Sequence, residues 1–471
     1  MKRLYITNAI PYVNASPHVG HALEFVQTDC LARYFRACGY DVYYSSGADE
    51  NSLKNVQAAE AEGVSTQKLV DKYAKQFADL GEVLNLTYDV FNRTSEKHHF
   101  AGAQKLWKLT KKEDIYKKTY RGLYCVGCEL FYTPGELVDG KCPEHNVEPE
   151  EVSEENYFFR LSSYQDWLYD LIDKDKLKIT PQTRKNEVLS FIKQGLEDFS
   201  ISRSEQRARG WGVPVPEDKS QVMYVWFDAL ATYLTALGYP GGNLYSKYWI
   251  DNPNRFHVIG KGIIRFHAVY WPAMLASAGL PLPTEEFVHG YITVEGQKIS
   301  KSLGNVVDPF DLVEKFGVDG VRYYLLREIP AWGDGDFSLS RFRELYNGEL
   351  ANGLGNLVAR VARLAADVNL NLPPRKNFKF KNAVSDSLKI YRFDHAITAL
   401  WDEIGSLDRR INDEKPWELE GRILKKVIGP IAQEVREIAF NLSPFLPQTS
   451  EKIIEQFTGK VSAEKPLFPR I

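Results

Sequence analysis

The chain has 471 residues. A single hydrophobic core rarely supports a chain of this length, so more than one domain is expected. With 44% hydrophobic and 26% charged residues it has the composition of a globular protein, which excludes a disordered chain. The net charge of −3 neither requires nor excludes a nucleic-acid partner, because a local basic patch is enough for binding. No apolar run approaches the roughly 18 residues of a membrane span, and the first strand-like residues follow Met1 too closely for a leader peptide. A cytoplasmic protein is expected.

The first predicted elements are a buried strand over residues 3–8 and a helix whose apolar residues recur every three to five positions after residue 20. Between them stands the sequence Pro17-His18-Val19-Gly20-His21. The backbone N–H groups and the dipole at a helix N-terminus favour phosphate, and Gly20 leaves room for a flat ring against the backbone. We therefore expect a nucleotide site here; two histidines that only cap the helix are the alternative.

Strands and helices alternate over residues 1–110, which is typical of a parallel sheet. The second strand, residues 41–46, runs into Asp49. Ligands gather at the carboxyl ends of parallel strands, so Asp49 is well placed to meet one, unless it only shapes a turn and caps a helix. The glycine fingerprint GxGxxG is absent, which argues against a dehydrogenase.

A cluster of metal-ligand residues follows the first half of the predicted sheet. It consists of Cys125 and Cys128, then, after thirteen residues, Cys142 and His145. Three thiolates and one imidazole can form a tetrahedral zinc site in which the protein fills every position, so the predicted role is structural. A metal-free remnant is the alternative.

The residue pattern divides the rest of the chain into segments. Charged and aromatic residues alternate over residues 150–220, and we interpret this segment as an insertion between two halves of one sheet. Sheet character resumes over residues 221–230 and again over residues 255–260. After residue 308 the pattern is helical, with an apolar stripe from Leu350 to Leu364 on one long helix and further helical stretches near residues 382–411, 416–442 and 447–458.

A second candidate site for phosphate lies at Lys298-Ile299-Ser300-Lys301-Ser302, after a strand-like segment over residues 287–294. A mobile loop with two lysines and two hydroxyls suits a polyphosphate whose charge builds up during reaction, although alone it would be an ordinary solvated loop. Taken with the histidine sequence, it resembles the paired HIGH and KMSKS signatures of the class I aminoacyl-tRNA synthetases.

Further segments resemble the methionyl branch of that family, and the resemblance covers essentially the whole chain. They are Ala9–Asn14, Tyr224–Leu230, Trp271–Leu275, Phe287–Tyr291, Asn356–Arg360 and Lys415–Trp417. The resemblance implies an α/β fold: a doubly wound, parallel, Rossmann-like catalytic sheet split by a zinc-bearing connective insertion, followed by an all-α anticodon-binding bundle. The implied catalytic domain has two halves, residues 1–114 and 217–306, separated by the insertion at residues 115–216. A stem-contact linker is expected over residues 307–340 and the bundle over residues 341–471.

The resemblance also implies roles for individual residues. His18 and His21 would stabilise the α-phosphate of ATP, and Lys298 and Lys301 would hold its β- and γ-phosphates. Residues expected around the adenosine are Gly20, Glu24, Gly260 and Ile292. Asp49 would pair with the α-ammonium group of methionine, and the expected thioether pocket is Ile10, Tyr12, Trp226, Ala229, Leu230, Tyr233, Ile263 and His267. For Trp226 and Tyr233, simple core packing is the alternative. Zinc would bind Cys125, Cys128, Cys142 and His145. The anticodon would be read by Asn356, Arg360 and Trp417. For Trp417, the alternative is a tryptophan buried in the core.

Two departures from the family pattern stand out. Asn51-Ser52 replaces the common His-Gly, and Gly262 replaces an aspartate expected near the nucleotide, so we assign no ribose-binding carboxylate at position 262. Ile299 in place of methionine is conservative.

The implied activity is the ATP- and magnesium-dependent conversion of L-methionine to methionyl-adenylate and its transfer to the terminal adenosine of methionine tRNA. The chain ends soon after the bundle, so a monomer is expected. A cysteine-specific ligase is a close rival, but such enzymes place zinc in the substrate pocket. Leucine, isoleucine and valine enzymes are typically far longer. A catalytically silent paralogue that only binds RNA is a rival of another class, and the presence of both histidines and both loop lysines argues against it.

Overall fold

The computed structural model describes residues 2–144, 146–299, 304–374 and 377–471. The chain divides into two compact units. The first unit consists of Met1–Pro17, Gly39–Gly81 and Tyr88–Val288, and the second of His18–Cys38, Glu82–Thr87 and His289–Ile471. Each unit is therefore assembled from segments that are far apart in sequence.

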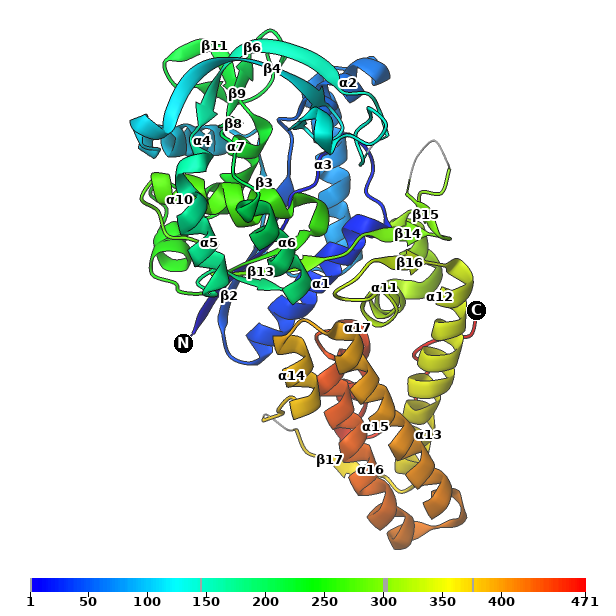
Figure 1. Cartoon of the computed structure of the whole chain (residues 1–471). Helices are drawn as coiled ribbons and strands as arrows, with labels where there is room; N and C mark the ends of the chain where they lie inside the picture. The colour runs from blue at the N-terminus through cyan, green and yellow to red at the C-terminus, as the bar shows by residue number, and fades with distance from the viewer. Residues whose placement is uncertain (1, 145, 300–303, 375–376) are drawn as a thin grey trace. The chain divides into compact units, whose positions relative to one another are not determined.

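The first unit is built on a six-stranded sheet (Figure 1). In spatial order its strands are β3 (Val90–Arg93), β2 (Asp41–Ala48), β1 (Arg3–Asn8), β12 (Arg255–Gly260), β13 (Glu285–His289) and β7 (Lys178–Thr180). β1 pairs in parallel with β2 and with β12, as β2 does with β3 and β13 with β7. The predicted parallel α/β sheet is confirmed, and β7 of the expected insertion extends its edge.

Three helices follow the first strands in this unit: α2 (Leu53–Glu62), α3 (Thr66–Val83) and α4 (Lys97–Leu109). The hydroxyl of Ser52 caps α2 by accepting a hydrogen bond from the Asn55 N–H at 3.3 Å, and Gly63 ends the helix in the left-handed region (φ 67°). Ser52 thus has a local structural role as a helix cap.

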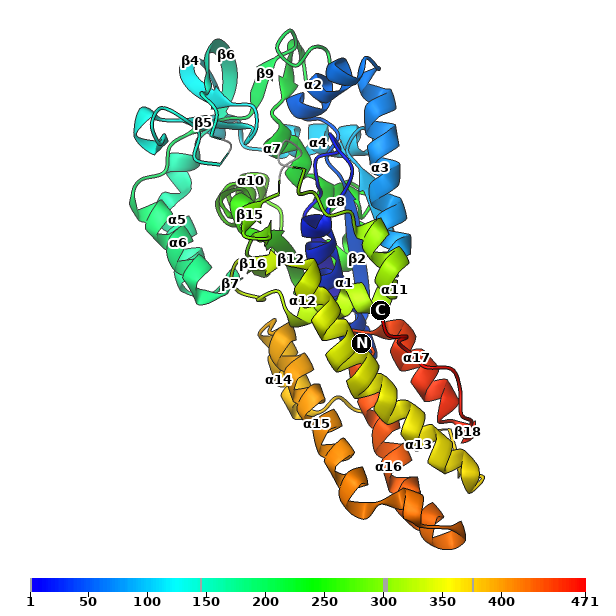
Figure 2. The ribbon, with the colours of Figure 1, turned by 90° about the vertical axis from the view of Figure 1, so that its right-hand side faces the viewer.

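The predicted insertion forms an antiparallel sheet in the order β5 (Leu130–Tyr132), β4 (Ile115–Cys125), β6 (Glu150–Phe159) and β8 (Phe199–Ser200). β4 and β6 form a long curved ribbon in Figures 1 and 2. A smaller sheet consists of β9 (Ser202–Ser204), β10 (Pro214–Val215) and β11 (Asp218–Met223), and the helices α5 (Gln165–Asp173) and α6 (Gln182–Lys193) belong to the same region.

The sheet character predicted for residues 221–230 is only half right. β11 ends at Met223, and α7 (Val225–Leu230) and α8 (Thr232–Thr235) are helical. All six residues of α7 are buried and only Asp228 among them is polar, so the run carries no periodicity that separates a helix from a strand. Further along lie β12, the π-helical turn η6 (Phe266–Tyr270) and α10 (Trp271–Ser277).

The second unit begins with α1 (Val19–Ala37) and includes the hairpin β14 (Ile292–Val294) and β15 (Gln297–Lys298). Glu295 and Gly296 form the hairpin turn, both with positive φ (49° and 74°). β14 also pairs in parallel with β16 (Gly335–Phe337), and the predicted strand over residues 287–294 is interrupted between β13 and β14. α11 (Pro309–Arg327) starts at Asp308, whose carboxylate accepts from the Phe310 N–H at 2.8 Å.

The rest of the second unit is mainly helical, with one short antiparallel pair, β17 (Asn371–Leu372) and β18 (Gly459–Lys460). The helices are α12 (Leu339–Leu345), the π-helical η8 (Tyr346–Gly355), α13 (Asn356–Asp367), α14 (Asn382–Lys389), α15 (Phe393–Glu414), α16 (Gly421–Leu442) and α17 (Pro447–Gln456). The predicted stripe from Leu350 to Leu364 is buried, and α13, α15 and α16 run side by side in Figures 1 and 2. The helix predicted near residues 382–411 is two helices, separated at Tyr391 with φ 61°.

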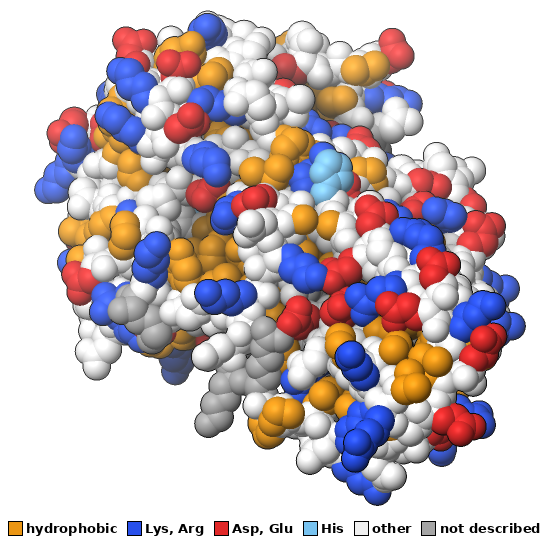
Figure 3. Space-filling model, turned by 90° about the horizontal axis from the view of Figure 1, so that it is seen from below, with side chains coloured by type: hydrophobic (Ala, Val, Ile, Leu, Met, Phe, Trp, Pro, Cys, Tyr) orange, Lys and Arg blue, Asp and Glu red, His pale blue; other side chains and the backbone are white. Residues whose placement is uncertain are grey.

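Within the described part of the chain, no helix is long and apolar enough to cross a bilayer. Lys and Arg side chains are interspersed with Asp and Glu over the face shown in Figure 3, as expected for a chain whose net charge is close to zero.

Candidate active site

The two predicted histidines lie at the start of α1. His18 is the N-cap residue: its Nδ1 accepts from the Gly20 N–H, and Nδ1 of His21 accepts from the His18 N–H, both at 3.1 Å. The two ring centroids are 3.9 Å apart. Capping, the alternative to a nucleotide site, is therefore present, and it also fixes the orientation of both rings.

Both imidazoles are neutral at physiological pH. Burial lowers the pKa of His18 to about 4, and burial together with the neighbouring His18 lowers the pKa of His21 well below its ordinary value. Because each Nδ1 accepts a backbone N–H, we assign the ring proton to Nε2 in both histidines. The helix N-terminus thus carries two N–H donors of neutral rings, which suits an anion.

The residues predicted around the adenosine fall into both units. A Cβ atom on Gly20 would lie 2.9 Å from Cε1 of His18 and 3.2 Å from Cγ2 of Ile292, so glycine permits this close approach. The Glu24 carboxylate contacts Nε2 of His289 at 2.8 Å. The second unit thus brings Gly20, Glu24 and Ile292 to one region and adds His289. This histidine lies in the family-like segment Phe287–Tyr291 but was not predicted as a site residue. Gly260 lies in the first unit, at the carboxyl end of β12.

Lys298 ends β15 as an exposed residue, and its carbonyl accepts from the Asn305 side-chain amide at 3.0 Å. Lys301, with Ser300 and Ser302, lies outside the described residues.

The predicted methionine residues gather in the first unit around Trp226. The Tyr12 ring meets Trp226 edge-on with ring centroids 6.4 Å apart, and the Phe266 ring stacks on Trp226 with centroids 3.6 Å apart. Ala229 and Leu230 follow on α7, and Ile10 and Ile263 pack against the same core. Phe266 was not predicted, although its position next to His267 in the sequence could have suggested it.

His267 and Tyr233 form a buried polar pair at this cluster. The Tyr233 hydroxyl is 2.7 Å from Nε2 of His267, and Nδ1 of that ring is 3.0 Å from the Ile263 carbonyl. Burial lowers the pKa of His267 to about 4, so the ring is neutral; it donates from Nδ1 and accepts at Nε2. Tyr233 is therefore part of the core and of a hydrogen-bond chain at the same time.

Asp49 lies beside Tyr12 through a backbone bridge and is 2% exposed. Its backbone N–H donates to the Pro11 carbonyl at 2.8 Å, and its carboxylate accepts from the Asn51 N–H at 3.3 Å. Burial, and then the nearby Asp228 carboxylate, raise the pKa of Asp49 well above its ordinary value. A cation bound at Asp49 would relieve this cost.

A buried network behind Asp49 was missed by the sequence analysis. The side-chain amide of Asn51 donates to Asp228 at 2.7 Å and to the Thr94 carbonyl at 2.9 Å, and His99 contacts the other oxygen of Asp228 at 2.5 Å. Asn51 therefore has a defined role in this network. These partners are more than 40 residues apart in sequence, so no local pattern could have revealed them.

Two polar groups of the Trp226 cluster have no hydrogen-bond partner among the described residues. They are the Tyr12 hydroxyl and the indole N–H of Trp226, both buried. Buried polar groups are usually satisfied, so a bound ligand or an ordered water has two hydrogen-bonding groups to meet here.

The three predicted cysteine ligands come together in the first unit. The sulfurs of Cys125, Cys128 and Cys142 lie within 4.8 Å of one another, and Cys125 and Cys142 are buried. The Tyr132 hydroxyl lies 3.1 Å from the Cys128 sulfur and 3.5 Å from that of Cys142. Three sulfurs at this spacing fit one ion with zinc–sulfur distances of about 2.3 Å, so the cluster can hold a metal. The fourth predicted ligand, His145, lies outside the described residues.

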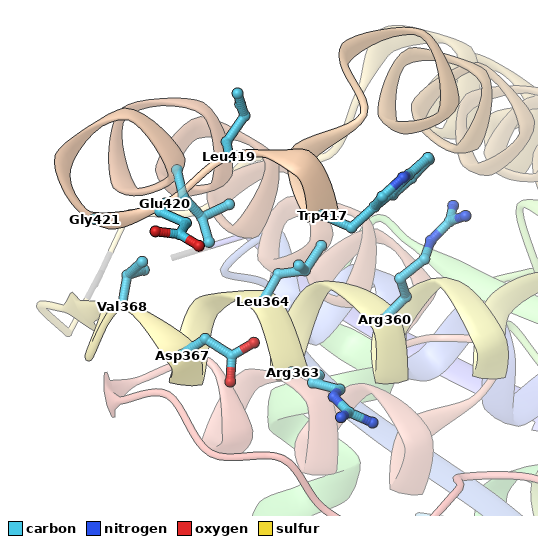
Figure 4. Close-up of a pocket in the computed structure, with 10 residues that line it drawn as sticks. Arg360, Arg363, Leu364, Asp367, Val368, Trp417, Leu419, Glu420 and Gly421 are labelled. Carbon is cyan, nitrogen blue, oxygen red and sulfur yellow. The ribbon is translucent and has the colours of Figure 1, made fainter.

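The predicted anticodon residues lie on and next to α13. Arg360 and Trp417 line one pocket of about 490 Å³, shown in Figure 4, and Asn356 is one helical turn before Arg360. Trp417 is 50% exposed, so the buried-core alternative is wrong. Arg360 bonds to Asn412 at 2.9 Å and pairs with Asp408. Arg363, which the sequence analysis did not single out, also lines the pocket.

The parallel α/β sheet of the first unit and the two neutral imidazoles at a helix N-terminus of the second are features that suit an enzyme that binds a nucleotide. The family profile described as "tRNA synthetases class I (M)" matches residues 4–362, about three quarters of the chain. The chain therefore belongs to the class I tRNA synthetases of the methionine branch, as the sequence motifs predicted, and is an aminoacyl-tRNA ligase.

Named relatives agree with this family. The methionine–tRNA ligase of Clostridium acetobutylicum is 40% identical over 510 residues, covering 100% of this chain and 78% of the relative. That of Brucella suis is 40% identical over 475 residues, covering 96% and 91%. The structure of Mycobacterium tuberculosis methionyl-tRNA synthetase in complex with methionyl-adenylate matches with a TM-score of 0.92 at 38% identity over 100% of both chains.

Proposed function

We propose that the chain activates L-methionine with ATP to form methionyl-adenylate and transfers the methionyl group to the 3′-terminal adenosine of methionine tRNA. The observation that carries this proposal, beside membership of the family, is the orientation of the two neutral imidazoles at the N-terminus of α1. ATP is expected to enter with Mg²⁺, which supplies charge neutralisation on its phosphates.

In the first step the methionine carboxylate attacks the α-phosphate, and pyrophosphate leaves. Negative charge on the α-phosphate oxygens is redistributed as its geometry changes. His18 and His21 would stabilise these oxygens through Nε2–H donors, assisted by the dipole of α1. Lys298 and Lys301 would hold the departing β- and γ-phosphates. No covalent enzyme intermediate is required, because positioning and charge stabilisation carry the step.

Methionine would bind in the Trp226 cluster. The Asp49 carboxylate would pair with the α-ammonium group, and that cation would offset the burial of the carboxylate. Trp226, Tyr12 and Tyr233, with the aliphatic groups of Ile10, Ala229, Leu230 and Ile263, would surround the thioether, while His267 would orient Tyr233. Sulfur–aromatic contacts of about 0.3–1.5 kcal/mol each favour a thioether.

Zinc would bind Cys125, Cys128, Cys142 and His145 in a closed structural site. We further propose that Asn356, Arg360 and Trp417 read the anticodon: the exposed Trp417 ring stacks on an unpaired base, while Arg360 leaves Asp408 and Asn412 to bond a base edge. Gly20, Glu24, Gly260 and Ile292 would surround the adenosine. The domain boundaries given above and a monomeric state complete the proposal.

The first test is amino-acid-dependent exchange of pyrophosphate into ATP. Methionine should stimulate exchange strongly, and leucine and cysteine should not. Equal stimulation by leucine would refute the methionine specificity, and stimulation by cysteine alone would favour the cysteine-specific rival.

Two variants test the phosphate residues. His18→Asn keeps a residue that can cap a helix but removes the imidazole, and kcat for exchange should fall about 100-fold with the KM for methionine unchanged. Lys301→Ala should also slow adenylate formation and spare methionine affinity. His98→Asn, at a partly exposed histidine of the first unit, is the control and should leave kcat unchanged. Unchanged rates in both test variants would favour a catalytically silent RNA-binding protein.

The anticodon proposal is tested with Trp417→Ala. Loss of one stacked base costs about 1–3 kcal/mol, so the KM for methionine tRNA should rise between about fivefold and 150-fold while exchange stays unchanged. Trp167→Ala, at another exposed tryptophan (38% exposed), is the matched control. A tRNA KM that rises equally in both variants would contradict the assignment.

A further inference from the structure

The residue after the predicted metal ligand Cys128 is unusual in its burial and in its backbone conformation. Glu129 is completely buried, and its backbone lies in the left-handed region (φ 52°), which residues with side chains rarely adopt. A carboxylate placed there must be held by strong partners, because burying an unpaired charge is costly.

Three groups donate to the Glu129 carboxylate. One oxygen accepts from the Leu53 backbone N–H at 2.8 Å. The other accepts from the Arg203 guanidinium at 2.8 Å and from the Tyr124 hydroxyl. The side chains of Arg203 and Glu129 are 7% and 0% exposed, so this is a buried ion pair.

These partners connect Glu129 to the chain segment of Asp49 and to that of Trp226. Leu53 is the first residue of α2 and lies four positions after Asp49. The Tyr224 hydroxyl donates to the Glu129 carbonyl, and Tyr224 lies two positions before Trp226. Glu129 therefore holds the segment of Asp49 from one side and the segment of Trp226 from the other.

A buried lysine extends this connection to Tyr12. The ammonium group of Lys54 lies 4.3 Å from the centre of the Tyr12 ring. Burial lowers the pKa of Lys54, and the nearby Glu129 carboxylate opposes that effect, as Cys128 and Asp49 also do. The negative charge of Glu129 thus helps to keep a cation over the Tyr12 ring.

We propose that Glu129 is a positioning residue for methionine: paired with Arg203, it transmits the geometry of the metal knuckle to Asp49, Tyr12 and Trp226. This inference rests on the proposed function. Glu129 acts through the segments it holds, so its loss should weaken methionine binding and leave ATP binding intact.

The experiment compares Glu129→Ala and Glu129→Gln with the native enzyme. Methionine affinity is measured twice, as the KM in pyrophosphate exchange and as the Kd from tryptophan fluorescence without ATP. Glu129→Ala should raise both about tenfold or more, with the KM for ATP changed less than twofold. Glu129→Gln keeps an oxygen for the Leu53 N–H and loses the charge, so its effect should be smaller. The control is Glu151→Gln, at a carboxylate of the same insertion in an exposed pair with Arg121.

The Arg203 side of the pair gives a second, independent test. Arg203→Ala should weaken methionine binding as Glu129→Ala does, and Arg203→Lys should recover part of the loss because it keeps the charge. If Glu129→Ala fails to fold, the Arg203 variants alone test the positioning role of the pair.

Several outcomes would overturn the proposal. A methionine KM and Kd within twofold of native in Glu129→Ala would do so, as would parallel rises in the KM for methionine and for ATP. Zinc content is measured in each variant; recovery of native methionine affinity after zinc is restored would make the metal, and not Glu129, the cause. If the native protein shows no methionine-dependent exchange, it is the proposed function that fails.

Discussion

At the scale of single residues, the site at the start of α1 depends on two backbone-to-imidazole hydrogen bonds. They orient the rings of His18 and His21, and burial keeps both rings neutral. Gly20 permits this arrangement because its hydrogen leaves room for the His18 ring and for Ile292.

Gly20→Ala should displace the His18 ring. The new Cβ would lie 2.9 Å from its Cε1, closer than real contacts allow. We expect the KM for ATP in pyrophosphate exchange to rise about tenfold or more, which corresponds to about 1.4 kcal/mol, while methionine affinity changes little. Gly405→Ala on α15, where the nearest atom lies at 3.7 Å, is the control. An ATP KM equal to that of the control would contradict this account of Gly20.

The pKa of His18, lowered to about 4, predicts a pH dependence of stability. Between pH 6.5 and 4 the unfolded chain protonates this imidazole while the folded chain keeps it neutral, so stability falls as the pH falls through that window. At pH 5 this single group costs about 2 kcal/mol. His18→Asn should therefore show a smaller drop in thermal unfolding temperature between pH 7 and pH 5 than the native chain. Equal drops would show that His18 does not contribute.

At the scale of elements, the short connection between β13 and β14 positions two site residues. His289 ends β13 and contacts Glu24, and Ile292 begins β14 next to Gly20. Between them, Gly290 passes so close to Gly333 that a Cβ atom would lie 2.1 Å from the Gly333 carbonyl oxygen. This obstacle is backbone, which cannot rotate away as a side chain can.

Gly290→Ala should therefore destabilise the second unit by about 1–3 kcal/mol, as overpacking usually does. It should also raise the KM for ATP, because His289 and Ile292 move with the connection. Thermal unfolding and exchange kinetics measure the two effects. Gly348→Ala, in η8 with no atom within 4 Å of the new Cβ, should be neutral or slightly stabilising. A Gly290→Ala variant as stable as this control would show that the backbone relaxes freely.

At the scale of the molecule, one buried ion pair joins four segments of the second unit. Arg322 of α11 contacts Asp29 of α1 at 2.8 Å, and both side chains are fully buried. The same guanidinium donates to the carbonyls of Phe445 and Pro444, and more weakly to that of Leu84. Burial raises the pKa of Asp29, but Arg322 and Arg33 outweigh it, so this pKa lies below its ordinary value.

Arg322→Met should cost about 3–5 kcal/mol of unfolding free energy, because it leaves the Asp29 carboxylate buried with less compensation. Combining it with Asp29→Asn should recover part of the loss, since the unpaired charge is then removed. Denaturant unfolding of the single and double variants measures both. Arg410→Met, at a half-exposed pair with Glu434, is the matched control and should cost less than about 1 kcal/mol. An additive double variant would contradict a direct interaction.

Patterns of neighbouring residues predicted much of this molecule. The first strand, the helix with His18 at its start, the parallel sheet and the cysteine cluster are confirmed. Each of these predictions used residues that are close together in the sequence, where the period of a helix or strand and the spacing of metal ligands can be read directly. The pattern did not predict the structure of residues 225–230, because a fully buried segment shows no polar and apolar periodicity, whether it is helix or strand.

The partners of the site residues could not be predicted in this way. Asn51 meets Asp228 across 177 positions, Glu129 meets Arg203 across 74, and Arg322 reaches Phe445 across 123. A polar residue shows in the sequence that it needs a partner once buried, but not which residue supplies it.

The sequence by itself determined the family and the chemical groups available for catalysis, because the histidine, lysine and cysteine motifs are local and their chemistry is intrinsic to the side chains. Only the tertiary structure decided which nitrogen of each imidazole accepts a backbone N–H, which carboxylates are buried and which segments they hold. Burial and hydrogen bonding set pKa values and orientation, and both arise from residues that the fold brings together from distant parts of the chain.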